Sequence, residues 1–254
     1  MKISVITPVL NGEKFLTSCL ESTKNQCNVN IEHIIVDGGS TDLTIEIAKA
    51  YNVKIIIAPN TSIYEANNIG IKNSTGDIIC FLNSDDFFTN QNCLKKVYDI
   101  FNNDKNIDIL YGNVHIVNEY NHLLYNYKPV KWFNYYIAKL ALFIVPHSST
   151  FFRRDMFILY GDYDVRYKYS SDIDYILTLK KNKAKFKYYN YFFSTFRRHN
   201  SNKSDESSSR NDFNLICKKH NFIYFETLQK FSYFFLNINN YKYFIFLILR
   251  NFIK

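Results

Sequence analysis

Two adjacent carboxylates follow the apolar run at residues 78–82, as Asp85 and Asp86 after Asn83 and Ser84. Carboxylates side by side at the tip of a buried strand repel each other unless a cation or hydrogen-bond donors compensate. Mg²⁺ or Mn²⁺ would do so, because these cations take oxygen ligands that they share with substrate phosphates. The motif therefore predicts a metal site, and a turn that caps the next helix is the alternative.

A second group of polar residues ends the first two apolar runs. The segment TPVLN occupies residues 7–11 and the segment DGGSTD occupies residues 37–42. A carboxylate such as Asp37 at a strand end can accept hydrogen bonds from a nucleobase or a ribose, and the glycines after it allow a close turn. Thr41 and Asp42 fit a helix cap equally well.

Two further groups lie late in the chain. In SSDIDY, residues 170–175, Asp172 fits a helix N-cap and Asp174 a favourable first-turn charge. In FRRHNS, residues 196–201, basic side chains can neutralise a phosphate leaving group or simply face solvent. From these residues alone, a role in a functional site and a purely structural role both stay open for each group.

The elements around these groups predict an α/β fold. Expected strands at residues 3–7, 31–36, 53–58 and 78–82 alternate with helical patterns, which indicates a mostly parallel sheet flanked by helices. Six of the seven glycines lie in the first 112 residues, mostly just after expected strands. Ligands of such sheets bind outside the carboxyl ends of the strands, where the polar groups fall.

The pattern changes after about residue 107. We expect strands at residues 107–113, 114–118, 123–128 and 149–153, and helices at 132–142 and 172–181. Residues 201–210 are serine-rich and predict a flexible loop. Beyond them an aromatic and basic helical tail, residues 222–254, fits either a membrane interface or packing on protein.

Composition narrows the class of protein. The 254 residues suffice for one large domain, and a hydrophobic share of 47% excludes a disordered chain. The net charge of +8 comes without a nucleic-acid-binding signature, so nucleic acid is not expected as a partner. Five scattered cysteines and no leader or spanning segment favour the reducing cytoplasm, with peripheral membrane contact left open.

The ordered motifs TPVLN, VDGGSTD and FLNSDD together resemble the family 2 glycosyltransferases, which have the GT-A fold. The resemblance covers roughly residues 1–200. It implies a catalytic domain at residues 1–221, with a nucleotide-sugar-binding half at 1–106, an acceptor-side half at 107–221 and a C-terminal helical extension.

The resemblance also implies roles for single residues. Asp172 matches the catalytic base, and His147 and Ser171 lie on the acceptor side. The metal ligands would be Asp85, Asp86 and His199, holding Mn²⁺ or Mg²⁺. The nucleotide-sugar donor would contact Thr7, Pro8, Val9, Asn11, Asp37, Asn67, Asn83, Ser84 and Arg197.

Three positions depart from the pattern of the family. Asn83 stands where the first metal-binding Asp is usual, Ser171 replaces a Glu and Glu65 replaces an Asp. The expected reaction is inverting transfer from a UDP-sugar, with GDP and TDP left open, to a saccharide or lipid-linked saccharide in cell-surface polysaccharide synthesis. A catalytically weak nucleotide-sugar-binding protein and a sugar-phosphate nucleotidyltransferase are the alternatives.

Overall fold

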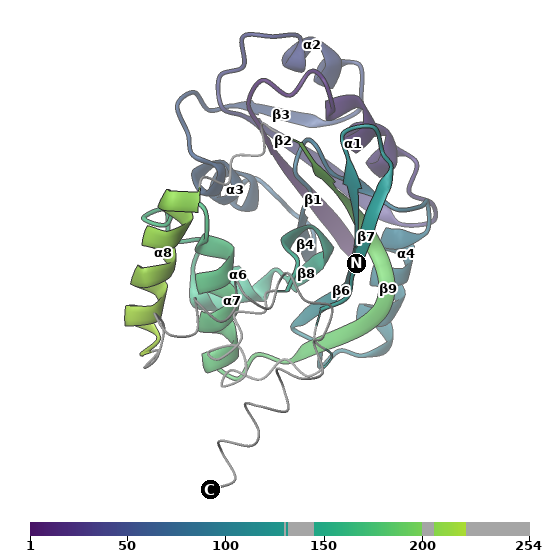
Figure 1. The fold of residues 1–254 in the computed structure, drawn as a ribbon. Helices are drawn as coiled ribbons and strands as arrows, with labels where there is room; N and C mark the ends of the chain where they lie inside the picture. The colour runs from purple at the N-terminus through teal and green to yellow at the C-terminus, as the bar shows by residue number, and fades with distance from the viewer. Residues whose placement is uncertain (130, 132–144, 200–205, 222–254) are drawn as a thin grey trace, which may run out of the picture.

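A nine-stranded mixed sheet with helices on both faces forms the frame of the protein (Figure 1). This is the architecture of a computed structural model, which describes residues 1–129, 131, 145–199 and 206–221. The strand order is β3-β2-β1-β4-β8-β6-β9-β5, and β7 pairs with β6 outside this path. The structure confirms the predicted α/β fold.

Four parallel strands form the first half of the sheet. They are β1 (Lys2–Val9), β2 (Asn30–Asp37), β3 (Lys54–Ile57) and β4 (Ile78–Phe81). Val9 lies opposite Asp37, and Ile6 lies opposite Phe81, so the strands end at a common edge. The polar motifs at residues 7–11, 37–42 and 83–86 therefore meet at this edge, as the sequence predicted.

Helices connect these strands and cover both faces. They are α1 (Leu16–Lys24), α2 (Thr44–Lys49), α3 (Ile63–Lys72) and α4 (Cys93–Asn103). A capping box starts α3, because Ser62 accepts from the Glu65 N–H while the Glu65 carboxylate accepts from the Ser62 N–H. Gly70 brings α3 close to the sheet, since a Cβ there would lie 2.3 Å from Ile6 Cγ2.

The second half of the sheet is mixed. Its strands are β5 (Phe87–Phe88), β6 (Ile109–Asn118), β7 (Leu123–Tyr127), β8 (Thr150–Arg153) and β9 (Phe186–Arg198). The pairings are antiparallel except that of β6 with β9. The two strands expected at 107–113 and 114–118 are one strand, because Gly112 does not end β6 but lies against Phe193 of β9.

The remaining described helices are η1 (His147–Ser149), α6 (Asp155–Tyr160), α7 (Ser171–Lys181) and α8 (Glu206–Lys219). The loop expected at 201–210 is wrong for its second half, since α8 begins at Glu206. Asp174 of α7 accepts hydrogen bonds from Lys219 Nζ at 2.6 Å and His220 Nε2 at 3.0 Å, which ties α8 to α7. The expected helix at 132–142 and the tail at 222–254 lie outside the described residues.

Alternate side chains of the central strands pack into two hydrophobic cores, one on each face of the sheet. Ile6 and Phe81 belong to the cluster packed with α3, α6 and α7, while Val5 and Cys80 belong to the cluster packed with α1 and α4. This alternation is the period of two expected of a strand. None of the helices in the described ranges is both long and apolar enough to cross a membrane.

Candidate active site

Two loops at the carboxyl edge, β1–α1 and β2–α2, are bonded to each other. The Asn11 N–H donates to Ser40 Oγ at 2.8 Å, and the Thr41 N–H donates to Asn11 Oδ1 at 2.9 Å. A third cross-loop bond joins the Gly12 N–H to Thr44 Oγ1 at 2.8 Å. Asn11 has a φ of 52°, a left-handed conformation that asparagine tolerates well, so the loop turns sharply here.

Asp37 stabilises the second of these loops. Its side chain is 1% exposed, and its Oδ2 accepts from the Gly39 and Ser40 N–H groups at 2.9 Å each. The carboxylate is thus placed at the end of β2, as predicted, and it holds the turn in the described chain. Gly39 has a φ of 96°, which only a residue without Cβ adopts readily.

Three of the predicted donor-binding residues lie inside the sheet. Thr7, Pro8 and Val9 are buried, and Thr7 Oγ1 lies 2.9 Å from His33 Nε2. Burial lowers the pKa of His33 to about 3, so this imidazole is neutral at pH 7. The side chains of this motif build the strand end, which leaves the backbone and Asn11 to face a ligand.

Two predicted donor-side amides are buried with unmet hydrogen-bonding groups. Both side-chain polar atoms of Asn67, on α3, and the Oδ1 of Asn83 have no partner among the described residues. Asn67 is fully buried. Buried amides nearly always have a partner, so unmet groups at this edge point to a ligand that completes them. Ser84, the residue after Asn83, lies beside the first loop, with its Oγ 3.4 Å from the position that a Cβ would take on Gly12.

Asp85 and His199 form the part of the predicted metal site that the structure brings together. His199 Nε2 lies 2.9 Å from Asp85 Oδ2, and the Phe15 ring packs against the imidazole at 4.8 Å. The Asp85 side chain is 21% exposed and the His199 side chain is 9% exposed. Within the described ranges there is no group of three His, Cys, Asp or Glu residues that could hold a metal. An oxygen and an imidazole nitrogen suit Mn²⁺, with phosphate or water filling the other positions.

Asp86, predicted as a metal ligand, bonds to the chain of β9. It is fully buried, and its Oδ1 accepts from the Arg197 N–H at 3.1 Å. Burial, reinforced by the charge of Asp85, raises the pKa of Asp86 well above its usual range. The carboxyl group thus joins the end of β4 to β9, and its role as a metal ligand stays a prediction.

Arg197, predicted to contact the donor, is buried against two aromatic rings. Its guanidinium lies 4.4 Å from the Phe15 ring centroid and 5.2 Å from that of Phe87, and it donates to Asn121 Oδ1 at 3.0 Å and to Ser18 Oγ at 3.1 Å. The residue is 2% exposed, and burial lowers the pKa of the group. These contacts stabilise a buried cation, and its contact with the donor stays a prediction.

Asp172, the predicted base, lies in the first turn of α7 and is half-buried. The Tyr64 hydroxyl of α3 donates to its Oδ1 at 2.6 Å. Next to it, Ser171 Oγ is buried without a partner among the described residues. Tyr64 was not among the predicted site residues, although Ser62 and Glu65 around it have the spacing of a capping box that starts a helix.

His147, predicted on the acceptor side, lies near Asp172. Its Nε2 is 3.0 Å from the Tyr163 hydroxyl, and its ring stacks on Phe81, the last residue of β4, at 4.9 Å. Burial lowers the pKa of His147, and the charge of Asp172 opposes this shift. Phe81 stands two residues before Asn83, so the acceptor-side group borders the donor-side edge.

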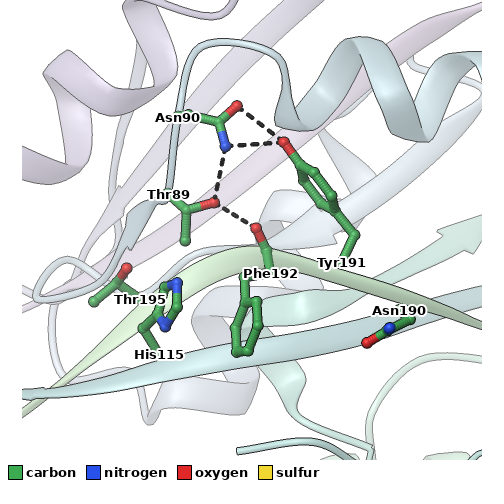
Figure 2. A pocket seen from close by; sticks show the side chains of 7 residues that line it. All are labelled: Thr89, Asn90, His115, Asn190, Tyr191, Phe192 and Thr195. Carbon is green, nitrogen blue, oxygen red and sulfur yellow. Dashed lines mark hydrogen bonds between the residues drawn. The ribbon is translucent and has the colours of Figure 1, made fainter. Parts of the chain in front are cut away.

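A hollow of about 380 Å³ opens in another part of the sheet (Figure 2). It is lined by Thr89, Asn90, His115, Asn190, Tyr191, Phe192 and Thr195. None of the residues predicted for the site lines it. The predicted residues instead surround the ends of β1, β2 and β4.

Comparison with known proteins identifies relatives. A model of the family described as Glycosyl transferase family 2 matches residues 4–161. A PGL/p-HBAD biosynthesis glycosyltransferase of Mycobacterium tuberculosis is 31% identical over 189 residues, which are 71% of this chain and 70% of the relative.

Solved structures agree with this fold. S. aureus TarS 1-349 in complex with UDP-GlcNAc superposes with a TM-score of 0.67 at 19% identity, and the match covers 86% of this chain and 66% of that one. The mannosyltransferase PcManGT from Pyrobaculum calidifontis, in complex with GDP-Man and Mn2+, gives a TM-score of 0.59 at 14% identity over 79% of this chain and 58% of that one. At these identities the likeness concerns the fold, and this chain spans about two thirds of the TarS structure.

Proposed function

The chain belongs to glycosyl transferase family 2, a family of enzymes that use nucleotide-sugar donors, and from this premise we propose that it transfers a sugar from a UDP-sugar to an acceptor hydroxyl with inversion. The proposal is carried by two pairs of bonded side chains. Asp85 with His199 joins the segments that follow β4 and β9, and Asp172 with Tyr64 joins α7 to α3. The Asp85 carboxylate suits a cation that also binds the diphosphate, and the Asp172 carboxylate suits a base that takes a proton from an alcohol.

The proposed chemistry is a single displacement. Asp172 Oδ2 accepts the proton of the acceptor hydroxyl while the acceptor oxygen bonds to the anomeric carbon. The bond from that carbon to the diphosphate breaks, and the electron pair leaves with the nucleoside diphosphate. Because an alcohol is too weak an acid to ionise beforehand, proton removal and attack belong to the same step.

Asp85 and His199 are the residues that would hold a divalent cation. Bound there, Mn²⁺ or Mg²⁺ would supply Lewis-acid stabilisation of the negative charge on the diphosphate. The buried amides of Asn67 and Asn83 would pair with polar groups of the donor, which accounts for their unmet hydrogen-bonding capacity. The two loops fixed by Asn11 and Asp37 would surround the nucleoside.

The donor and acceptor classes rest on the named relatives. TarS was solved with UDP-GlcNAc, which supports a UDP-sugar as the donor. PcManGT was solved with GDP-Man, so GDP-sugars should be tested as well. The mycobacterial relative is named as a glycosyltransferase of PGL/p-HBAD biosynthesis, which supports sugar transfer in a biosynthetic pathway. We propose that the acceptor is a saccharide or a lipid-linked saccharide, and that the transfer takes place at the cytoplasmic face of a membrane.

The test is a panel of nucleotide sugars, read first by thermal shift with and without Mn²⁺ and then by release of nucleoside diphosphate. One UDP-sugar should raise the melting temperature and be slowly hydrolysed. Stabilisation without hydrolysis or transfer would favour a binding protein. Release of pyrophosphate from a nucleoside triphosphate and a sugar phosphate would instead identify a nucleotidyltransferase.

A further inference from the structure

Helix α3 reaches from the donor-side edge to the residues around Asp172. Tyr64, Asn67 and Asn68 stand at spacings of three and four, so they share one face of this helix. Asn68 Nδ2 donates to the Tyr163 carbonyl at 2.8 Å, and Asn68 Oδ1 accepts from the Tyr163 N–H at 3.0 Å. Both members of this clamp are buried, so the segment between α6 and α7 is fixed to α3.

The second contact of the same helix face is the hydrogen bond from Tyr64 to Asp172. The phenol is 5% exposed, and its ring packs on that of Tyr163 with centroids 5.4 Å apart. Its hydroxyl lies 2.6 Å from Asp172 Oδ1, a short distance for a bond to a carboxylate. In the described part of the chain the other oxygen, Oδ2, makes no hydrogen bond.

We propose that Tyr64 is a positioning residue for the proposed sugar transfer, because it holds one oxygen of Asp172 and leaves the other directed to the acceptor. A carboxylate without this anchor rotates about two side-chain torsions, and few of its orientations suit proton removal. Holding a base in one orientation raises the rate of the chemical step without changing donor binding. The inference rests on the proposed function, since it assigns Tyr64 a role only through Asp172.

Three other titratable groups lie around Asp172. They are Tyr64 from α3, His147 from η1 and Tyr163 from the α6–α7 segment. Burial first, and then the charge of Asp172, raises the pKa of both tyrosines well above the usual range, and burial lowers the pKa of His147. All three are therefore neutral near pH 7, so Tyr64 acts as a donor and not as an acid.

The test is Tyr64→Phe in the full chain with the donor found in the panel. We expect kcat to fall at least about tenfold, with donor KM within about twofold of wild type. The matched control is Tyr175→Phe on α7, whose buried hydroxyl has no partner among the described residues and whose loss should leave kcat unchanged.

A double substitution separates positioning from a general loss of stability. In the Asp172→Asn background, Tyr64→Phe should change the residual transfer by less than about twofold, because no carboxylate remains to be held. Equal losses in both backgrounds, or a Tyr64→Phe enzyme with wild-type kcat, would overturn the inference alone. A wild-type chain that transfers no sugar would overturn the proposed function and the inference together.

Discussion

His199 Nε2 and Asp85 Oδ2 lie 2.9 Å apart, although one residue follows β9 and the other follows β4. The pairing of β5 with β9 brings them together, because Phe87 lies opposite Thr195. The two ligand candidates are thus fixed by the sheet.

A first prediction concerns this pair. Asp85→Asn and His199→Ala should each raise the Mn²⁺ concentration needed for half-maximal transfer at least about tenfold, on the scale known for perturbed metal sites. Manganese binding followed by electron paramagnetic resonance should weaken in parallel without any substrate. Asp86→Asn is the control, since this buried group bonds the Arg197 N–H and its replacement should leave Mn²⁺ binding unchanged.

A second prediction separates the two carboxylates of α7. Asp172→Asn should lower transfer by about 10²–10⁴-fold and leave UDP binding intact, because a general base is lost. Asp174→Asn makes the same chemical change two residues away and weakens the bonds to Lys219 and His220. It should lower the melting temperature with a far smaller loss of kcat, as measured by calorimetry and initial rates. Similar kcat values for the two variants would remove Asp172 from the role of base.

A third prediction concerns Arg197. Arg197→Lys keeps the charge but loses the planar group that contacts the rings of Phe15 and Phe87. The free energy of unfolding should therefore fall by about 2 kcal/mol. Arg198→Ala, at the exposed neighbouring position, should change stability by less than about 0.5 kcal/mol. Urea unfolding measures both. A raised donor KM with unchanged stability in Arg197→Lys would contradict this account and support the predicted donor contact instead.

A fourth prediction concerns pH and Glu32 at the opposite edge of the sheet. Its carboxylate accepts from Lys2 Nζ at 2.8 Å and from the Gly76 N–H at 2.9 Å. Burial opposes the charged form, but the bonds from Lys2, Ser4 and Thr75 outweigh it and lower the pKa of Glu32 to about 2 from 4.5.

The stabilisation by Glu32 should therefore be complete above about pH 4.5 and be lost as the pH falls toward 2. Glu32→Gln should lower the free energy of unfolding by up to about 3 kcal/mol at pH 7, since each pKa unit corresponds to about 1.4 kcal/mol. The difference from wild type should shrink steadily below pH 4. A difference that is the same at pH 7 and pH 3 in urea unfolding would contradict this account.

The sequence was sufficient for the parallel half of the sheet. Strands β1 and β4 are short buried apolar runs, and each is followed by polar residues, so both the fold class and the functional edge could be predicted from local pattern. Asp172 was predicted as the base because its motif resembles that of the family, whereas by itself the residue fitted a helix N-cap better.

Other features depend on contacts between distant segments. Strand β9 carries aromatic residues on both faces, so Phe192 and Phe193 show no alternation that would reveal a strand. The burial of Arg197 could not be predicted, because only its contacts with Phe15 and Phe87 make a buried cation stable there. Tyr64 was missed for the same reason, since its partner lies 108 residues away.

The bonds between the β1–α1 and β2–α2 loops have a consequence for how this protein can change over evolution. Asn11 accepts from the Thr41 N–H while its own N–H is held by Ser40, so neither loop has an independent shape. A substitution at position 11 that removes the acceptor would disturb the turn that Asp37 holds. Positions 11, 40 and 41 should therefore covary among descendants of this gene, and a donor with a different base would be accommodated by joint replacement of both loops.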